Sequence, residues 1–194
     1  MGTVRADMPS FPDFDEPLSG QEVQLRLAAE RDIPEILIAH QDDPLLAARL
    51  GLARPPSGAE LGRRTEEAAA ERAEGSGVYL TILRPGSDEC RGQLDVHDVD
   101  WDHRRAQLGI WVAPGERGQG LARGALAVVG AWLLQACGLM RVDLLTEPDN
   151  QALIRAAEAA GFRPEGVLRS YLREHRHRVD VAVMSLIPAD LGAL

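Results

Sequence analysis

Three closely spaced apolar segments constrain this chain's fold more than any other feature. Residues 77–84, 92–101 and 106–113 have the length and pattern of β-strands, and the short links PGSDEC and DHRR join them. Strands with such short links run antiparallel, because a parallel connection needs a crossover of about a dozen residues or more. Apolar positions at helical spacing follow from Gly118 to about Cys137. We therefore expect an antiparallel meander followed by a helical crossover.

The segments on either side of this meander complete an α/β pattern. Ser57 and Glu60 form an S-x-x-E capping box at the start of one helix, and Gly161 is the expected stop of another. The helices are expected within 30–41, 55–75, 118–137 and 150–162, and the remaining strands at 23–28, 140–146, about 164–171 and 179–187. The pattern predicts one α/β domain whose single mixed, mostly antiparallel sheet has about seven strands and four flanking helices.

The charged and sulfur-containing residues exclude several kinds of function. The formal net charge is −9, whereas nucleic-acid binding needs clustered positive charge. All 21 basic residues are arginine, which excludes Schiff-base chemistry and a Walker-type phosphate loop, since both need lysine. Cys90 and Cys137 lie far apart, so we expect free buried thiols rather than a disulfide or a catalytic thiol. His175 and His177 lack further ligands at a suitable spacing, so we expect a solvated turn there and no metal site.

The first twenty residues differ from the rest of the chain in composition. Residues 1–20 are rich in proline and acidic side chains, and we expect a flexible tail that precedes a domain over residues 21–194. The alternative is that Phe11 and Phe14 dock on the domain or on a partner. No apolar run reaches the ~18 residues that a membrane span needs, and the N-terminus lacks a signal-peptide pattern. We therefore expect a cytoplasmic protein without membrane contact.

A stretch rich in glycine and arginine, GERGQGLARG, lies where the helix after the meander begins. Glycine is about 1 kcal/mol less favourable than alanine inside a helix, so Gly118, Gly120 and Gly124 need a reason. A helix N-terminus has unpaired N–H groups and a partial positive charge, and small residues let an anion reach them. Arg117 and Arg123 can add charge. The stretch predicts a phosphate site, with a tight strand-to-helix turn as the alternative; the dinucleotide pattern G-x-G-x-x-G fails because Arg123 stands where its third glycine would be.

The same stretch resembles the pyrophosphate loop of the GNAT superfamily of N-acetyltransferases. Residues 117–122, RGQGLA, match its pattern [Q/R]-x-x-G-x-[G/A]. The strand and loop AQLGIWVAPGERGQGLA, the helix PDNQALIRAAEAAGF and the strand EGVLRSY resemble the RimJ/RimL-like branch in order and spacing. The resemblance covers roughly residues 22–188 and implies the GNAT fold, with acetyl-CoA as acyl donor, an amine or peptide acceptor, and a monomer or homodimer.

The resemblance also implies where acetyl-CoA binds. The strand that ends at Val112 would splay from the strand at 140–146, its backbone pairing with the pantetheine arm and the Val112 N–H holding the developing oxyanion. Asn150 would bind the pantetheine arm, cap its helix, or do both. The expected binding residues are Ile110, Trp111, Val112, Arg117, Gly118, Gln119, Gly120, Leu121, Ala122, Arg123, Asn150 and Arg155.

The expected reaction is direct attack of a primary amine on the thioester, without a covalent enzyme intermediate. This chain has Gln107 where many relatives have glutamate, and Leu153 where many have serine. His97, supported by Asp95, and Tyr171 are the candidates for proton transfer, and Asp95, Gln107 and Glu165 for contact with the substrate. Glu165 could instead fix the turn after Gly161. The leading function is an N-acetyltransferase for a protein N-terminus, amino acid or small amine; the alternative is a non-catalytic acyl-CoA-binding sensor or structural module.

Overall fold

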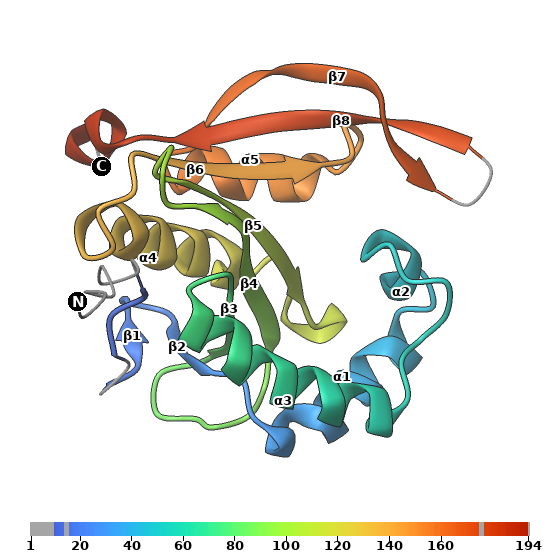
Figure 1. Cartoon of the computed structure of the whole chain (residues 1–194). Helices are drawn as coiled ribbons and strands as arrows, with labels where there is room; N and C mark the ends of the chain where they lie inside the picture. Colours follow the sequence, from blue (N-terminus) through green and yellow to red (C-terminus); the bar gives the residue numbers. More distant parts are fainter. Residues whose placement is uncertain (1–9, 14–15, 175–176, 194) are drawn as a thin grey trace, which may run out of the picture.

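The computed structural model describes residues 10–13, 16–174 and 177–193 (Figure 1). They form one eight-stranded sheet in the order β1-β2-β3-β4-β5-β6-β8-β7. The strands are β1 Leu18–Ser19, β2 Gln24–Leu27, β3 Val78–Leu83, β4 Gly92–Asp100, β5 Arg105–Val112, β6 Arg141–Thr146, β7 Arg163–Glu174 and β8 His177–Leu186. The helices are α1 Ile33–Asp42, α2 Leu46–Arg49, α3 Gly58–Glu74, α4 Leu121–Gln135 and α5 Gln151–Ala159, with short 3-10 turns at Glu30–Asp32, Pro114–Glu116 and Pro188–Ala193.

The predicted α/β class and the antiparallel meander β3–β4–β5 are confirmed. Every described pair of neighbouring strands is antiparallel except β5–β6, which is parallel across the crossover through α4. The expected numbers of about seven strands and four helices are each one too low for the described residues. The missing elements are β1, of 2 residues, and α2, of 4 residues, and both are too short for a periodic pattern to show.

The predicted helix boundaries hold where a side chain or a glycine sets them. The Ser57 hydroxyl accepts from the Glu60 N–H and the Glu60 carboxylate accepts from the Ser57 N–H, which confirms the capping box. Gly161 follows α5 with φ of 95°, as expected of a helix stop. Helix α4 begins at Leu121 rather than at Gly118, because Gly118 and Gly120 have φ of 73° and 85° and lie outside the helical region.

The main core lies between the sheet and α4. Leu80, Leu94, Leu108 and Leu144 of four adjacent strands are at most 1% exposed and belong to one apolar cluster. The cluster includes the α4 residues Leu121, Ala125, Leu126, Val129 and Leu133. Alternation in β4 then directs Asp95 and His97 to the opposite face, the face on which Arg64 of α3 covers the Tyr79 ring. The buried leucines of the meander thereby determine which polar side chains are left for chemistry.

Gly124 belongs to this packing and not to an anion site. A Cβ atom at Gly124 would lie 2.9 Å from Cγ1 of Val23, closer than real Cβ contacts. The sequence-based reason for this third glycine was therefore wrong: it lets α4 approach the start of β2.

The described part of the N-terminal segment lies against the domain. Phe11 is 6% exposed. Its ring stacks on Trp132 at a centroid distance of 5.7 Å and meets Trp101 edge-on at 5.3 Å. Leu18 and Ser19 pair with β2, and Asp13 forms an ion pair with Arg72. The alternative of docking thus holds for Phe11, while Phe14 lies outside the described residues.

Replacement of Phe11 by alanine tests this docking. We expect Phe11→Ala to lower the free energy of unfolding by about 3 kcal/mol, the usual cost of removing a buried phenyl ring. Urea titration would measure the change. Tyr171→Ala is the matched control, because Tyr171 is 50% exposed, and we expect a change within about 0.5 kcal/mol. Equal effects of the two substitutions would contradict the docking of Phe11.

Candidate active site

The site begins where β5 and β6 separate. The two strands pair over four residues, from Arg105↔Arg141 to Leu108↔Leu144. Beyond Leu108, β5 continues to Val112 beside β4, and β6 continues to Thr146 beside β8. The edges that face each other beyond this point have no strand between them.

The backbone of β5 presents hydrogen-bonding groups to this gap. The Ala113 N–H donates to the Arg91 carbonyl at 2.8 Å, on the β4 side. Successive residues of a strand present their backbone groups to opposite edges, so those of Val112 and Ile110 face away from β4. The Val112 carbonyl accepts from Nε of Arg117 at 3.0 Å, as this direction requires. The N–H groups of Ile110 and Val112 can therefore bind an extended ligand in the gap.

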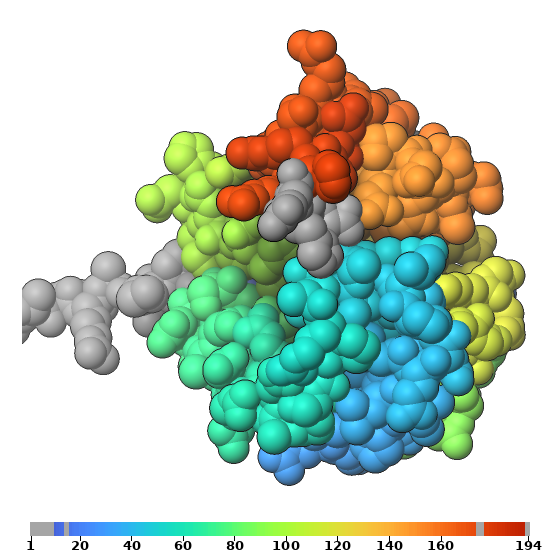
Figure 2. Space-filling model, turned by 90° about the vertical axis from the view of Figure 1, so that its right-hand side faces the viewer, coloured from blue at the N-terminus to red at the C-terminus, as the bar shows by residue number. Residues whose placement is uncertain are grey.

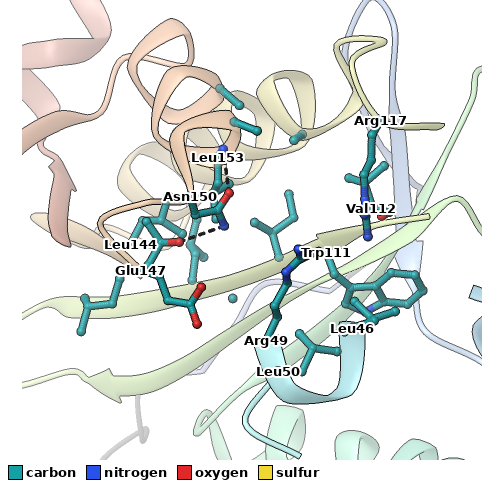
Figure 3. Close-up of a pocket in the computed structure, with 18 of the residues that line it drawn as sticks. Leu46, Arg49, Leu50, Trp111, Val112, Arg117, Leu144, Glu147, Asn150 and Leu153 are labelled. Atoms are coloured by element: carbon teal, nitrogen blue, oxygen red, sulfur yellow. Dashed lines mark hydrogen bonds between the residues drawn. The ribbon is translucent and has the colours of Figure 1, made fainter. Parts of the chain in front are cut away.

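The gap opens into a cavity of about 1100 Å³. Trp111 and Val112 of β5, Leu144 of β6 and Asn150 at the start of α5 line it (Figure 3). Residues of α2 form a further wall, and Leu172 and Arg173 of β7 line it as well. Figure 2 looks at the side of the molecule where the α2 segment lies across from the β7–β8 hairpin. A volume of this size accommodates a cofactor-sized ligand together with a second small molecule.

The glycine loop leads from β5 to α4 along this cavity. Gly118 and Gly120 line it, and both have a positive φ that favours glycine. No atom would lie within 4 Å of a Cβ at Gly118, whereas at Gly120 the Glu22 carboxylate would lie 2.7 Å away. The first N–H groups of α4 are free of any side-chain cap at Gly120. The loop thus provides the open helix N-terminus that an anion needs.

The two arginines of the loop are engaged by the chain's own carboxylates. Arg117 donates from Nη2 to Asp43 at 2.7 Å, and Arg123 donates to Glu22 at 3.0 Å. Both arginines line the cavity, but each already has a carboxylate partner within the chain. Arg117 mainly fastens the loop to the end of α1, a role that the loop pattern did not predict.

Asn150 and Arg155 place polar groups on the α5 side of the cavity. The Asn150 side chain caps α5 by accepting from the Leu153 N–H at 3.3 Å, and its amide donates to the Thr146 hydroxyl at 3.1 Å (Figure 3). Its capping role is therefore present, and it also lines the cavity. Arg155 lies one turn further along α5 and lines the same cavity.

A row of polar side chains reaches the cavity from the meander. Nδ1 of His97 lies 2.7 Å from Oδ2 of Asp95, and Nε2 of His97 lies 2.8 Å from Nε2 of Gln107. Because a carboxylate accepts only, Nδ1–H donates to Asp95, and Nε2 of the neutral ring accepts from the Gln107 amide. The hydrogen bond to Asp95 raises the pKa of His97 above its ordinary value of 6.5. All three residues line the cavity.

Gly109 makes room for this row. Asp95 pairs with Gly109 across the β4–β5 ladder, and a Cβ at Gly109 would lie 2.6 Å from Oδ1 of Asp95. The role of Gly109 was not predicted from the sequence, although a glycine inside a strand is a recognised signal of close approach.

Comparisons with known proteins agree with this geometry. The family model described as "Acetyltransferase (GNAT) domain" matches residues 22–163. The chain belongs to the GNAT acetyltransferases. It is 31% identical over 119 residues to YoaA, an uncharacterized N-acetyltransferase of Bacillus subtilis, covering 61% of this chain and 67% of that protein. The solved structure of Mycobacterium smegmatis RimJ in complex with CoA-disulfide is 26% identical, with a TM-score of 0.77, covering 87% of this chain and 83% of that one.

The fold of this GNAT acyltransferase is shared more widely. RimL, a ribosomal L7/L12 alpha-N-protein acetyltransferase solved with coenzyme A, superposes with a TM-score of 0.78 at 19% identity, covering 89% of this chain and 98% of that one. Structural relatives therefore include members of the RimJ/RimL-like branch that the loop and its neighbours had indicated.

Three of the expected site residues of this GNAT acyltransferase lie outside the cavity. Tyr171 is 50% exposed on β7, which forms the outer edge of the sheet. Glu165 accepts from both Nη groups of Arg141, at 2.8 and 2.7 Å, and from the Ser185 hydroxyl, and these bonds lower the pKa of Glu165 to about 2. The Gln119 side chain bonds to Arg84 and to the Gly115 carbonyl. Their placement supports neither a catalytic role for Tyr171 nor a substrate contact by Glu165.

Glu165 does not fix the turn after Gly161 either, because its partners lie on β6 and β8. Strands β7 and β8 are longer than expected and leave a shorter connection. His175 lies outside the described residues. His177 is exposed, as expected, but it belongs to strand β8 and not to a turn.

Metal binding, thiol chemistry and membrane insertion find no support among the described residues. Within residues 10–13, 16–174 and 177–193, no group of three or more His, Cys, Asp and Glu side chains could hold a metal ion. Cys90 and Cys137 are free, but only Cys90 is buried as expected, whereas Cys137 is half-buried. Burial raises the pKa of each thiol to about 12, so both stay protonated at neutral pH. No helix in the described part of the chain is long and apolar enough to cross a membrane.

Gly109→Ala tests the polar row without any ligand. The added methyl group must displace the Asp95 carboxylate, so we expect the pKa of His97 to fall towards its ordinary value. Titration of the His97 ring protons by NMR would measure this shift, and Asp95→Asn should shift the pKa in the same direction. Gly115→Ala is the matched control, because no atom lies within 4 Å of its Cβ position. An unchanged His97 titration in Gly109→Ala would contradict the assigned contact.

Proposed function

We propose that this chain is an acetyl-CoA-dependent N-acetyltransferase that transfers the acetyl group directly to a primary amine. The observation that carries the proposal is the gap between β5 and β6, with the glycine loop at one end and His97 at the other. A thioester in this gap would have donors for its carbonyl on one strand and a titratable nitrogen on the same cavity wall. The CoA complex of the RimJ structure supports this choice of donor.

The gap fits acetyl-CoA in shape and in donors. The N–H groups of Ile110 and Val112 would pair with the amides of the pantetheine arm as an added strand would. Gly118, Gly120 and the first turn of α4 would bind the pyrophosphate, and Arg155 a further phosphate. Acetyl-CoA supplies the activated acyl group; the steps below belong to the protein.

The protein would stabilise charge and move one proton. Nε2 of His97 would accept the proton of the acceptor ammonium, directly or through one water, and Asp95 would stabilise the imidazolium that forms. The Gln107 amide would turn, so that its oxygen accepts from the newly protonated Nε2. The amine nitrogen then bonds to the thioester carbon and gives up its second proton to solvent, the Val112 N–H holds the oxyanion, and the carbon–sulfur bond breaks. A thiolate with a pKa of about 8.5 can leave and take its proton from solvent, so Tyr171 is not required.

The acceptor is proposed as a primary amine on a protein N-terminus, an amino acid or a small molecule. The RimL relative is an alpha-N-protein acetyltransferase, which favours peptides as the first acceptors to try. A thiol-release assay with acetyl-CoA and a panel of peptides, amino acids, polyamines and aminoglycosides would test the activity. A protein that binds acetyl-CoA but releases no thiol with any of them would be a sensor or structural module instead. We further expect a monomer or a homodimer, with β7 as the free edge for pairing.

Ligand-induced stabilisation tests the loop assignment. At about 100 times its dissociation constant, acetyl-CoA should stabilise the protein by about 2.7 kcal/mol, and thermal melting would show the shift. We expect Gly118→Glu to abolish the shift, because it places a carboxylate at the phosphate position. Gly86→Glu is the matched control, since Gly86 has a similar φ of 77° with nothing near its Cβ position, but lies outside the cavity. Both should lose similar intrinsic stability, and a normal shift in Gly118→Glu would contradict the loop assignment.

Steady-state kinetics test the base. We expect His97→Ala to lower kcat by about 10²-fold or more, while the dissociation constant of acetyl-CoA barely changes. Because the pKa of His97 is raised, activity should increase with pH through a value above 6.5. Asp95→Asn removes the main cause of the raised pKa of His97, so the rise in activity with pH should occur at lower pH. A His97→Ala enzyme with full activity and an unchanged pH profile would exclude His97 as the base.

A further inference from the structure

One buried carboxylate connects two walls of the cavity. Oδ2 of Asp43, between α1 and α2, accepts from Nη2 of Arg117 at 2.7 Å and from Nη1 of Arg49 at 3.1 Å. Oδ1 of Asp43 accepts from the Leu45 N–H at 3.1 Å. The Asp43 side chain is 11% exposed, so solvent screens these charge-assisted bonds weakly.

Arg117 continues the connection to β5. While its Nη2 donates to Asp43, its Nε donates to the Val112 carbonyl at 3.0 Å. A guanidinium is planar and rigid, so the position of one donor determines the position of the other. Any displacement of Asp43 is therefore transmitted to the end of β5, which borders the gap.

Arg49 continues the connection in the other direction. Leu46, Arg49 and Leu50 of the α2 segment line the cavity beside Trp111 (Figure 3). The backbone bonds of this segment are local, such as Arg49 N–H to Leu45 and Leu50 N–H to Leu46. Among the described hydrogen bonds and ion pairs, the Asp43–Arg117 contact is the one that joins the α1–α2 corner to β5 and its loop.

We propose that Asp43 is a positioning residue that couples the α2 wall of the cavity to the donor-binding edge of β5. The chain of contacts runs from Arg49 through Asp43 and Arg117 to the Val112 carbonyl. Binding of the donor along β5 would order Arg117, and the shared carboxylate would then order α2. The roles of the two walls rest on the proposed function, whereas the chain of contacts does not.

Amide hydrogen exchange of α2, measured with and without CoA, tests this coupling. In the wild-type protein, we expect saturating CoA to slow exchange in residues 45–52 by about tenfold, within the usual range for two coupled sites. In Asp43→Asn the slowing should disappear although CoA still binds. Asparagine keeps an oxygen for the Leu45 N–H but loses the charge that two arginines share.

Two further variants sharpen the experiment. Asp42→Asn is the matched control, because Asp42 is the exposed neighbouring residue, and it should keep the wild-type slowing. Arg117→Lys leaves the contacts of Asp43 with Arg49 and Leu45 intact, but its single, shorter-reaching ammonium lacks the planar fork that holds the Asp43 and Val112 contacts in a fixed relation. It should lose the slowing as Asp43→Asn does, and it keeps the test valid if Asp43→Asn fails to fold.

The outcomes separate this inference from the proposed function. The coupling would be supported if CoA slows amide exchange of α2 in the wild type and in Asp42→Asn, but not in Asp43→Asn or Arg117→Lys. Equal slowing in all CoA-binding variants would mean direct contact between CoA and α2 and would overturn it, with the proposed function untouched. If CoA stabilises no variant and not the wild type, the proposed function fails, and the coupling fails with it.

Discussion

The separation of β5 from β6 is the constraint on which the rest of this structure depends. A sheet that opens in its middle leaves two strand edges with unpaired backbone groups, which normally carries a free-energy cost. Here each strand keeps a full partner on its other side, β4 for β5 and β8 for β6, up to Val112 and Thr146. The cost is thereby confined to the two inner edges, and a ligand that pairs with them recovers it.

The nitrogen-containing side chains around the cavity are paired with carboxylates of the chain. Arg117 and Arg123 of the glycine loop form ion pairs with Asp43 and Glu22, so carboxylates of the chain itself balance their charges. On the meander, the Asp95 carboxylate is held against His97 by the space that Gly109 leaves. Both arrangements use a carboxylate to position a nitrogen, one at the glycine-loop end of the cavity and one at the His97 end.

Much of the fold and part of the candidate site could be predicted from the sequence, because their signals are local. The meander and the capping box at Ser57 and Glu60 follow from short-range rules, whereas the positive φ of Gly118 and Gly120, which delays the start of α4 to Leu121, was not predicted. The Asp95–His97 pair follows from strand alternation. The partner of Arg117 could not be predicted, since Asp43 lies 74 residues away. Glu165 was misplaced for the same reason, because only the folded sheet brings Arg141 and Ser185 to it.

The three tryptophans of the chain fall into two separate environments. Trp111 lines the cavity, whereas Trp101 and Trp132 enclose the Phe11 ring away from it. Indole fluorescence responds to local polarity and to quenching groups, so the tryptophan emission of this protein combines signals from two separate environments. With Trp111 replaced by phenylalanine, emission would follow the docking of the N-terminal segment alone. With Trp101 and Trp132 replaced, it would follow occupancy of the cavity.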